Sequence, residues 1–218
     1  PIIAAMLDYD LTRWGTPLRY AVETVGTVAF AASGILAGMR KRMDVFGISV
    51  LGFLAAFGGG TLRDILLDRR PFFWVAEEEM LWLVLAMCAL SLMLWRGGRR
   101  AAISAKAIQV ADALGLGLFA ASGVQYALVA QMSPLVAVLM GVVTGVFGGV
   151  MRDIACNEMP TAFADHRPYA VLAFLGGWVY LAVQWLGGPA WAALIGATLV
   201  TTGLRLLALK LDWRLPGW

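Results

Sequence analysis

The sequence is poor in charge: only 14% of its 218 residues are Asp, Glu, Lys or Arg, whereas soluble domains carry about 25%. Hydrophobic residues make up 61% of the chain, and its mean hydropathy is +0.78. A soluble chain of this length needs a polar surface around its core, and too few polar residues are present to form one. The composition therefore excludes a soluble domain and predicts a membrane protein.

Cysteine and histidine are also scarce. Two cysteines, Cys88 and Cys156, are too few for a disulfide framework or a thiolate metal site. A single histidine, His166, argues against a histidine metal centre, and the sequence shows no nucleophile–base constellation for catalysis. The pI of about 9.1 does not indicate nucleic-acid binding, because basic residues of membrane proteins mark cytoplasmic loops. We therefore expect no enzyme activity, no cofactor and no nucleic-acid partner.

Long apolar segments, separated by charged or Pro- and Gly-rich breaks, predict an all-α polytopic membrane protein. The segments are continuously apolar rather than alternating, which favours a helical bundle over a β-barrel. Seven transmembrane helices are expected, at Leu18–Met39, Val45–Leu67, Met80–Trp95, Ala107–Gln131, Pro134–Ile154, Tyr169–Leu186 and Ala190–Leu209.

The basic residues indicate which side of the membrane each terminus occupies. With seven spans, twelve Lys and Arg residues fall on the side of the C-terminus and five on the side of the N-terminus. Cytoplasmic loops are enriched in Lys and Arg, so we expect a cytoplasmic C-terminus and an N-terminus outside. The basic loop at residues 96–106 suits anionic lipid headgroups, but a plain topology signal is the favoured interpretation.

Two segments of the chain repeat each other at a spacing of 89 residues. The sequence Phe-Ala-Ala-Ser-Gly occurs at 30–34 and again at 119–123, and a Gly-Gly-x-x-Arg-Asp-Ile motif occurs at 59–65 and at 148–154. Agreement of separate features at one spacing indicates an internal duplication.

Each repeated unit contains three predicted spans. Because three is odd, the second copy must enter the membrane from the opposite face, which gives an inverted 3+3 repeat plus a seventh helix. That architecture recurs in proteins that move solutes. The expected parts are an N-terminal segment, a first three-helix repeat, a basic loop, an inverted second repeat and a seventh helix with its tail, at residues 1–17, 18–95, 96–106, 107–187 and 188–218.

Glu23 and Asp112 correspond in the two copies, and each lies inside a predicted span. Charged residues within the membrane normally face the protein interior or water. Together with two neutral Arg-Asp pairs, and with Arg19 and Arg205 near the span ends counted with the flanking sides, they give the spans a net charge of −2. An acidic interior attracts cations and repels anions, so both acids are candidate residues of an ion pathway.

Two Arg-Asp pairs, Arg63-Asp64 and Arg152-Asp153, follow the repeated glycines by about one helical turn. One interpretation makes them mouth or gate residues of a shared path. The other is that each pair ends its helix at the membrane interface with a local salt bridge. The sequence leaves both interpretations open.

The glycines Gly58, Gly59 and Gly60 lie deep in the second span, and Gly148 and Gly149 lie in the fifth. Glycine inside a helix costs about 0.8–1.0 kcal/mol relative to alanine. We expect each run to kink or unwind its span, so that the freed carbonyl oxygens bind Na⁺ or K⁺ transiently. The alternative is close packing of helices through small residues.

Hydroxyl side chains near these groups are candidates to line a hydrated path. They are Thr24, Thr27, Ser33, Thr61, Ser122 and Thr144. Each of them has the ordinary alternative of a hydrogen bond within its own helix.

Two three-helix repeats, a seventh helix and the Gly-Gly-Gly-x-x-Arg-Asp motif at 58–64 resemble the prokaryotic branch of the trimeric intracellular cation (TRIC) channels. The resemblance covers about residues 18–209. It implies a homotrimer in the plasma (inner) membrane, with a pore in each subunit permeable to K⁺ and Na⁺. It also implies that the second and fifth helices are kinked at their glycines.

The sequence departs from the TRIC pattern in two places. Animal members carry a Lys-Glu-Val motif associated with phosphoinositide binding, and residues 106–110 lack it. The second glycine run has Phe147 where the first has Gly58. Bacterial relatives with this repeat have also been labelled glycine transporters. The sequence favours a monovalent-cation channel, with a carrier of a small zwitterion such as glycine as the alternative, in which Arg63 or Arg152 would bind the carboxylate.

Overall fold

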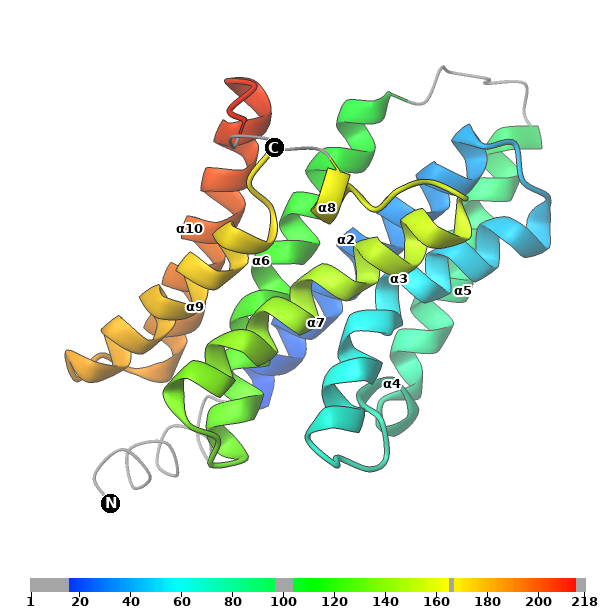
Figure 1. The fold of residues 1–218 in the computed structure, drawn as a ribbon. Helices are drawn as coiled ribbons and strands as arrows, with labels where there is room; N and C mark the ends of the chain where they lie inside the picture. The colour runs from blue at the N-terminus through cyan, green and yellow to red at the C-terminus, as the bar shows by residue number, and fades with distance from the viewer. Residues whose placement is uncertain (1–15, 97–103, 165–166, 215–218) are drawn as a thin grey trace.

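The computed structural model describes residues 16–96, 104–164 and 167–214, and in these ranges the regular structure is entirely helical (Figure 1). The helices are α2 (Thr16–Arg40), α3 (Val45–Leu66), α4 (Phe73–Ala76), α5 (Glu78–Arg96), α6 (Ala105–Val129), α7 (Pro134–Ala155), α8 (Thr161–Ala164), α9 (Ala170–Trp185) and α10 (Ala190–Lys210). The predicted N-terminal segment up to residue 15, the centre of the basic loop and His166 lie outside the described residues.

Each of the seven predicted spans coincides with a helix whose ends lie within two residues of the predicted ends. Five of these helices, α2, α3, α6, α7 and α10, are long and apolar enough to cross a membrane. Helix α9 is also apolar but has only 16 residues. The all-helical class is therefore confirmed, whereas the number of spans stays a prediction.

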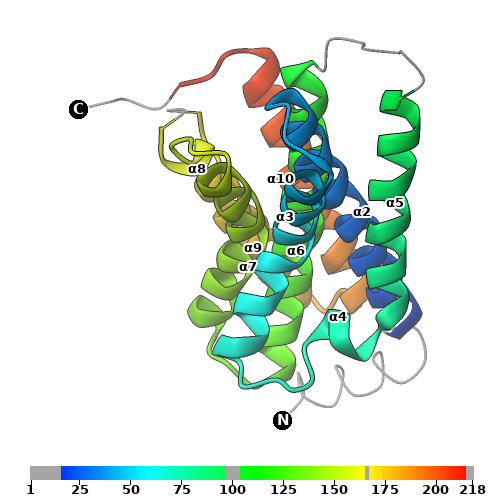
Figure 2. The same cartoon turned by 90° about the vertical axis from the view of Figure 1, so that its right-hand side faces the viewer.

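The helix boundaries repeat with the spacing found in the sequence. Helices α2 and α3 coincide with α6 and α7 when 89 is added to their residue numbers. The left-handed residues that follow these helices obey the same spacing, since Arg42 matches Gln131 and Asp68 matches Asn157, all with φ between 50° and 59°. Figure 1 shows α2 and α6 running in opposite directions. The short helices α4 and α8 lie at opposite ends of the molecule, and we call these ends the α4 face and the α8 face (Figure 2).

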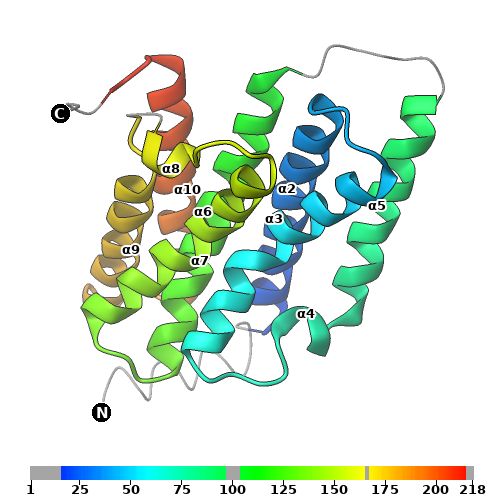
Figure 3. The same ribbon diagram turned by 45° about the vertical axis from the view of Figure 1, so that its right-hand side comes forward.

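Helices α2, α3, α6 and α7 form the centre of the molecule, with α5 packed on α2 and α3 and with α9 and α10 on α6 (Figure 3). Helices α3 and α7 cross in close contact. A Cβ atom on Gly59 would lie 2.1 Å from the carbonyl oxygen of Thr144, and one on Gly148 would lie 2.5 Å from that of Ala55. Gly59 is equivalent to Gly148 at the 89-residue spacing, and Ala55 is equivalent to Thr144. The same contact is therefore made twice, once in each direction across the crossing.

The glycine runs do not unwind their helices. Helix α3 continues through residues 58–60 and α7 continues through 148–149, so the prediction of unwound segments is wrong. Backbone groups in a membrane must be hydrogen-bonded within the protein, which favours an intact helix. The close packing at the crossing offsets the low helix propensity of glycine. Figure 3 shows α3 curving along its length while it stays helical.

Candidate functional site

Arg63, near the end of α3, is the centre of the first buried ion cluster. Its Nη1 donates a hydrogen bond to Glu23 Oε1 of α2 at 3.2 Å, and its Nε donates to Asp64 Oδ1 at 2.9 Å. The other oxygen of Asp64 accepts a 2.8 Å hydrogen bond from the backbone N–H of Phe73, the first residue of α4. The α4-face cluster (Glu23, Arg63 and Asp64) therefore joins two long helices to the short one.

Arg152, near the end of α7, is the centre of the second cluster. Its Nη1 donates to Asp112 Oδ1 of α6 at 2.6 Å, and its Nε donates to Asp153 Oδ1 at 2.8 Å. Asp153 Oδ2 accepts from the backbone N–H of Thr161, the first residue of α8, at 2.8 Å, and also from the hydroxyl of Thr161. The α8-face cluster (Asp112, Arg152 and Asp153) thus repeats the arrangement of the first.

The charge of each cluster follows from its composition. One guanidinium lies between two carboxylates, so the three residues of each cluster sum to −1 if all are ionised, and the two clusters together to the −2 predicted for the spans. At the α4 face, Arg69 adds a further ion pair, with its Nη1 3.6 Å from Asp64 Oδ1. Sequence reasoning found all six residues and the local Arg-Asp salt bridges. It did not find that each arginine also pairs with a carboxylate 40 residues away on another helix.

The two clusters differ in their further contacts. Asp112 Oδ2 accepts a 2.7 Å hydrogen bond from the hydroxyl of Tyr169, and Arg152 donates to the hydroxyl of Ser33. Among the described residues, Glu23 Oε2 has no hydrogen-bond partner, although Glu23 is buried. The α8-face cluster is therefore the more completely hydrogen-bonded of the two.

An aromatic ring covers the α4-face cluster. The guanidinium carbon of Arg63 lies 3.9 Å from the centre of the Tyr126 ring, and those of Arg69 and Arg19 lie 4.3 and 5.3 Å from it. Cations at such distances are attracted by the face of an aromatic ring. Tyr126 is buried, and the three arginines surround its ring.

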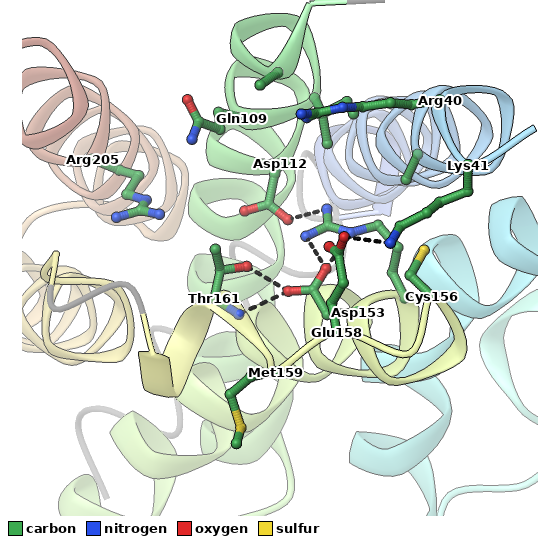
Figure 4. A pocket seen from close by; sticks show the side chains of 14 residues that line it. Arg40, Lys41, Gln109, Asp112, Asp153, Cys156, Glu158, Met159, Thr161 and Arg205 are labelled. Carbon is green, nitrogen blue, oxygen red and sulfur yellow. Dashed lines mark hydrogen bonds and ion pairs between the residues drawn. The ribbon is translucent and has the colours of Figure 1, made fainter.

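A cavity of about 430 Å³ reaches the α8-face cluster and is lined by all three of its residues (Figure 4). Arg40 and Arg205 line the same cavity. Basic and acidic groups thus share one polar cavity, which has room for water and small solutes. Further lining residues include Lys41 and Glu158, joined by an ion pair, Cys156, and Gln109.

Of the predicted hydroxyl residues, the structure brings only Ser33 into contact with a cluster. Thr61 accepts a 2.9 Å hydrogen bond from an indole N–H. Ser122 and Thr144 donate to carbonyl oxygens of their own helices, at 3.3 and 2.6 Å. The hydroxyl of Thr27 lies 3.9 Å from a methionine sulfur. For these four residues, the contacts observed are ordinary packing and helix contacts.

Sequence reasoning missed Tyr126, Tyr169 and Arg69. Tyr126 stands in an apolar predicted span, where an aromatic residue carries no signal of its own. Aligning the two copies at the 89-residue spacing would have drawn attention to it, because Ala37 is its counterpart. The same alignment pairs Tyr169 with Met80, but the contact of Tyr169 with Asp112 depends on how α9 packs against α6.

Known proteins resemble this chain in sequence. The model of the family described as "Glycine transporter" matches residues 20–96 and 109–185, two segments again displaced by 89 residues. A UPF0126 membrane protein of Vibrio cholerae is 37% identical over 94% of this chain and 84% of its own length. The UPF0126 inner membrane protein YadS of Escherichia coli is 38% identical over 91% of this chain and 95% of its own length.

Solved structures resemble it in fold. A structure reported for conductance through TRIC cation channels shares 35% identity and a TM-score of 0.78, over 91% of this chain and 96% of the other. The TRIC trimeric intracellular cation channel orthologue from Rhodobacter sphaeroides shares 32% identity and a TM-score of 0.80, over 89% and 98%. The family match over more than half of the chain, the similar relatives and the similar structures show that the chain is a membrane protein of the family that includes the UPF0126 proteins and the TRIC cation channels.

Proposed function

We propose that the protein is a monovalent-cation channel, permeable to K⁺ and Na⁺, that assembles as a homotrimer with a pore within each subunit. The observation that carries the proposal is the likeness to TRIC cation channels, at 35% identity over 91% of the chain. The two clusters add a physical reason, because each places two carboxylates beside one guanidinium within the helical bundle. Such sites favour cations over anions.

The proposed architecture is an inverted 3+3 repeat of seven spans with an additional last helix, α10. The equal displacement of helix boundaries supports the duplication, and the opposite directions of α2 and α6 support the inversion. The excess of Lys and Arg on the α8 face favours a cytoplasmic location for that face and for the C-terminus, with the N-terminus outside.

The proposed path runs between α3 and α7 and passes both clusters. The helices touch at Gly59 and Gly148, so the crossing is closed in this conformation. Because the closest contacts at Gly59 and Gly148 are with backbone atoms, a small separation of the two helices would expose polar groups there. The transient ligands of the cation would be the carbonyl oxygens of Gly58, Gly59, Gly60, Gly148 and Gly149, which keep a second lone pair in an intact helix.

Planar bilayer recording with purified protein tests the proposal. We expect unitary currents whose reversal potential in a KCl gradient lies close to that of K⁺. Replacing Glu23 by Gln or Asp112 by Asn should lower the cation-to-anion permeability ratio by roughly fivefold, because one unit charge at several ångströms contributes about 1–2 kcal/mol. A matched control is Glu79→Gln, which neutralises an acid at the exposed start of α5.

Absence of cation-selective currents at every voltage and Ca²⁺ concentration would exclude the channel. Unchanged selectivity in both acid variants would remove Glu23 and Asp112 from the mechanism.

A carrier of a small zwitterion is the second candidate. The family model's description and the cavity at the α8 face favour it, because Arg152 there offers a cation to a carboxylate while Asp112 offers an anion to an amine. Saturable counterflow of labelled glycine into liposomes, without unitary currents, would support this function. Glycine uptake that is absent or does not saturate would exclude it.

A further inference from the structure

We propose that Tyr126 is the gate of the α4-face cluster, and that Ala37, its counterpart in the other copy, leaves the α8-face cluster open. The inference deepens the proposed function and rests on it in one respect: a conducting path must pass both clusters. It assigns a second closed point of that path, in addition to the helix crossing, to one side chain.

The two copies differ at positions 37 and 126, which the 89-residue spacing relates. Ala37 lies on α2 and lines the cavity that reaches Arg152. Tyr126 lies at the equivalent place on α6, and its ring lies 3.9 Å from the guanidinium carbon of Arg63. Where one copy has a methyl group and a cavity, the other has a phenol ring against the arginine.

Two further pairs of equivalent positions near Ala37 and Tyr126 also line the cavity in one copy and contact the tyrosine ring in the other. Ile108 and Glu158 line the cavity on the α8 face, and their counterparts are Arg19 and Arg69. These two arginines lie beside the Tyr126 ring, at 5.3 and 4.3 Å. The ring is thus held among three guanidinium groups, two of which have no basic equivalent in the other copy.

The α4-face cluster, which the tyrosine ring covers, is also the more deeply buried of the two clusters. Glu23, Arg63 and Asp64 are 1%, 0% and 0% exposed. Asp112, Arg152 and Asp153 are 4%, 4% and 7% exposed and line the cavity. Two clusters of the same design therefore differ in their access to water.

The surroundings of Tyr126 suit a movable side chain better than a permanent core. Three buried polar atoms of the groups around it have no hydrogen-bond partner among the described residues: Arg19 Nε, Glu23 Oε2 and Glu77 Oε2. A buried polar atom without a partner is costly, and entering water would satisfy it. Movement of the ring would hydrate these atoms, which offsets the loss of its contacts with the arginines.

Thiol accessibility tests the gate without requiring any current. The native Cys156 lines the α8-face cavity and reports on that side. Ser122 is fully buried, one helical turn before Tyr126, so Ser122→Cys reports on the other side. Both reporters are studied in a Cys88→Ala background, the second also with Cys156→Ala. The protein is placed in nanodiscs, where both faces meet water, and is treated with a membrane-impermeant cationic methanethiosulfonate.

We expect the reagent to modify Cys156 at least tenfold faster than Ser122→Cys. Adding Tyr126→Ala should raise the rate at Ser122→Cys at least tenfold and leave the rate at Cys156 unchanged. Tyr126→Phe, which keeps the ring, should leave Ser122→Cys protected. Equal acceleration of both reporters would indicate general loosening and would overturn the proposal, as would no acceleration at Ser122→Cys.

A second variant, Ala37→Tyr, places a tyrosine at the equivalent position of the other copy. It tests the same proposal if Tyr126→Ala does not fold. It should slow modification of Cys156 at least tenfold, and an unchanged rate would contradict the proposal. In the bilayer, Tyr126→Ala should raise the open probability. Absence of currents from the unmodified protein would exclude the proposed channel, whereas the labelling rates decide the gate independently.

Discussion

Each buried arginine balances carboxylates that the membrane interior would otherwise not accept. An ionised acid without a partner is strongly disfavoured in a medium of low dielectric constant. Glu23 and Asp112 each pair with an arginine 40 residues away, and a second carboxylate follows each arginine directly in the sequence. The clusters are therefore structural elements as well as candidate ion sites, and the two roles can be separated by experiment.

Removing one arginine should destabilise the protein more than removing it together with its partner. Arg152→Met leaves two carboxylates buried side by side, and we expect a loss of about 3–5 kcal/mol in the free energy of unfolding. The double variant with Asp112→Asn should recover part of this loss, with a coupling energy of about 0.5–3 kcal/mol. Denaturant unfolding in detergent micelles measures both.

The control for this cycle is the ion pair of Lys41 and Glu158, whose side chains are 38% and 56% exposed. A pair so open to solvent contributes at most about 1 kcal/mol, so Lys41→Met should have little effect. Equal losses for Arg152→Met and Lys41→Met would contradict the stabilising role of the buried cluster.

Glu77, between α4 and α5, should make stability depend on pH. Burial raises the pKa of its carboxyl above 4.5, and the charge of Glu23 raises it further, while Arg19 and Arg69 oppose the shift. An acid with a raised pKa binds its proton more tightly in the folded state, so stability should increase as the pH falls through that pKa. Thermal unfolding between pH 7 and pH 4 should show this increase in the unmodified protein.

Glu77→Gln should remove that part of the pH dependence, because the amide does not titrate. The variant should also be the more stable protein at neutral pH, where Glu77 is charged. A pH profile that is the same with and without the substitution would show that Glu77 does not contribute.

The sequence identified the charged residues of the site but not how they pair. Glu23, Asp112, Arg63 and Arg152 are conspicuous because charge within apolar segments is rare. Which carboxylate meets which arginine depends on the rotation and tilt of two helices about each other. The hydrophobic pattern of a membrane helix does not specify that rotation, because lipid and neighbouring helices are both apolar.

At the scale of helices, Gly59 and Gly148 allow α3 and α7 to pack closely against each other. Gly59→Ala would place a Cβ atom 2.1 Å from the carbonyl oxygen of Thr144 on α7, so the two helices must move apart. We expect a loss of about 1–3 kcal/mol in the free energy of unfolding, as for other overpacked sites. Thermal or denaturant unfolding in micelles measures this loss.

Gly203 provides the matched control within α10. A Cβ atom there meets no other atom within 4 Å, and the residue is exposed. Gly203→Ala should therefore stabilise the protein by about 0.4–1 kcal/mol, since alanine restricts the unfolded chain more than glycine does. Similar effects of the two substitutions would mean that helix propensity, not contact across the crossing, dominates at Gly59.

The helices themselves were largely predictable, because apolar segments of membrane length leave few alternatives. The one-turn helices α4 and α8 were not predicted, since four residues are too few for a periodic pattern. Their first residues are held by Asp64 and Asp153, contacts that only the folded chain reveals. The prediction of unwinding at the glycines was wrong because it considered only their low helix propensity. The close packing of α3 against α7 compensates for that propensity.

At the scale of the whole molecule, the proposed homotrimer gives a direct prediction. Native mass spectrometry in gentle detergent should show a complex three times the mass of the 23.4 kDa chain. The complex should persist in Tyr126→Ala, because Tyr126 is buried within the subunit. A monomer or dimer as the main species would exclude the proposed assembly.

The 89-residue spacing is visible in the sequence alone, and the helix boundaries follow it. The difference between the two faces was not visible. Replacing alanine by tyrosine in an apolar segment looks like ordinary variation until the structure places Ala37 at a cavity and Tyr126 against Arg63.

The reciprocal contact at the crossing of α3 and α7 also limits how the two copies can diverge after duplication. Gly59 contacts residue 144 and Gly148 contacts residue 55. Each copy therefore limits the size of the side chains that the other can carry there. A larger residue at any of these positions requires compensation in the opposite copy. Positions 37 and 126 contact different clusters and carry no such mutual restriction. The matched centre can thus be kept while the two ends of the molecule differ, so that two similar halves present unlike faces.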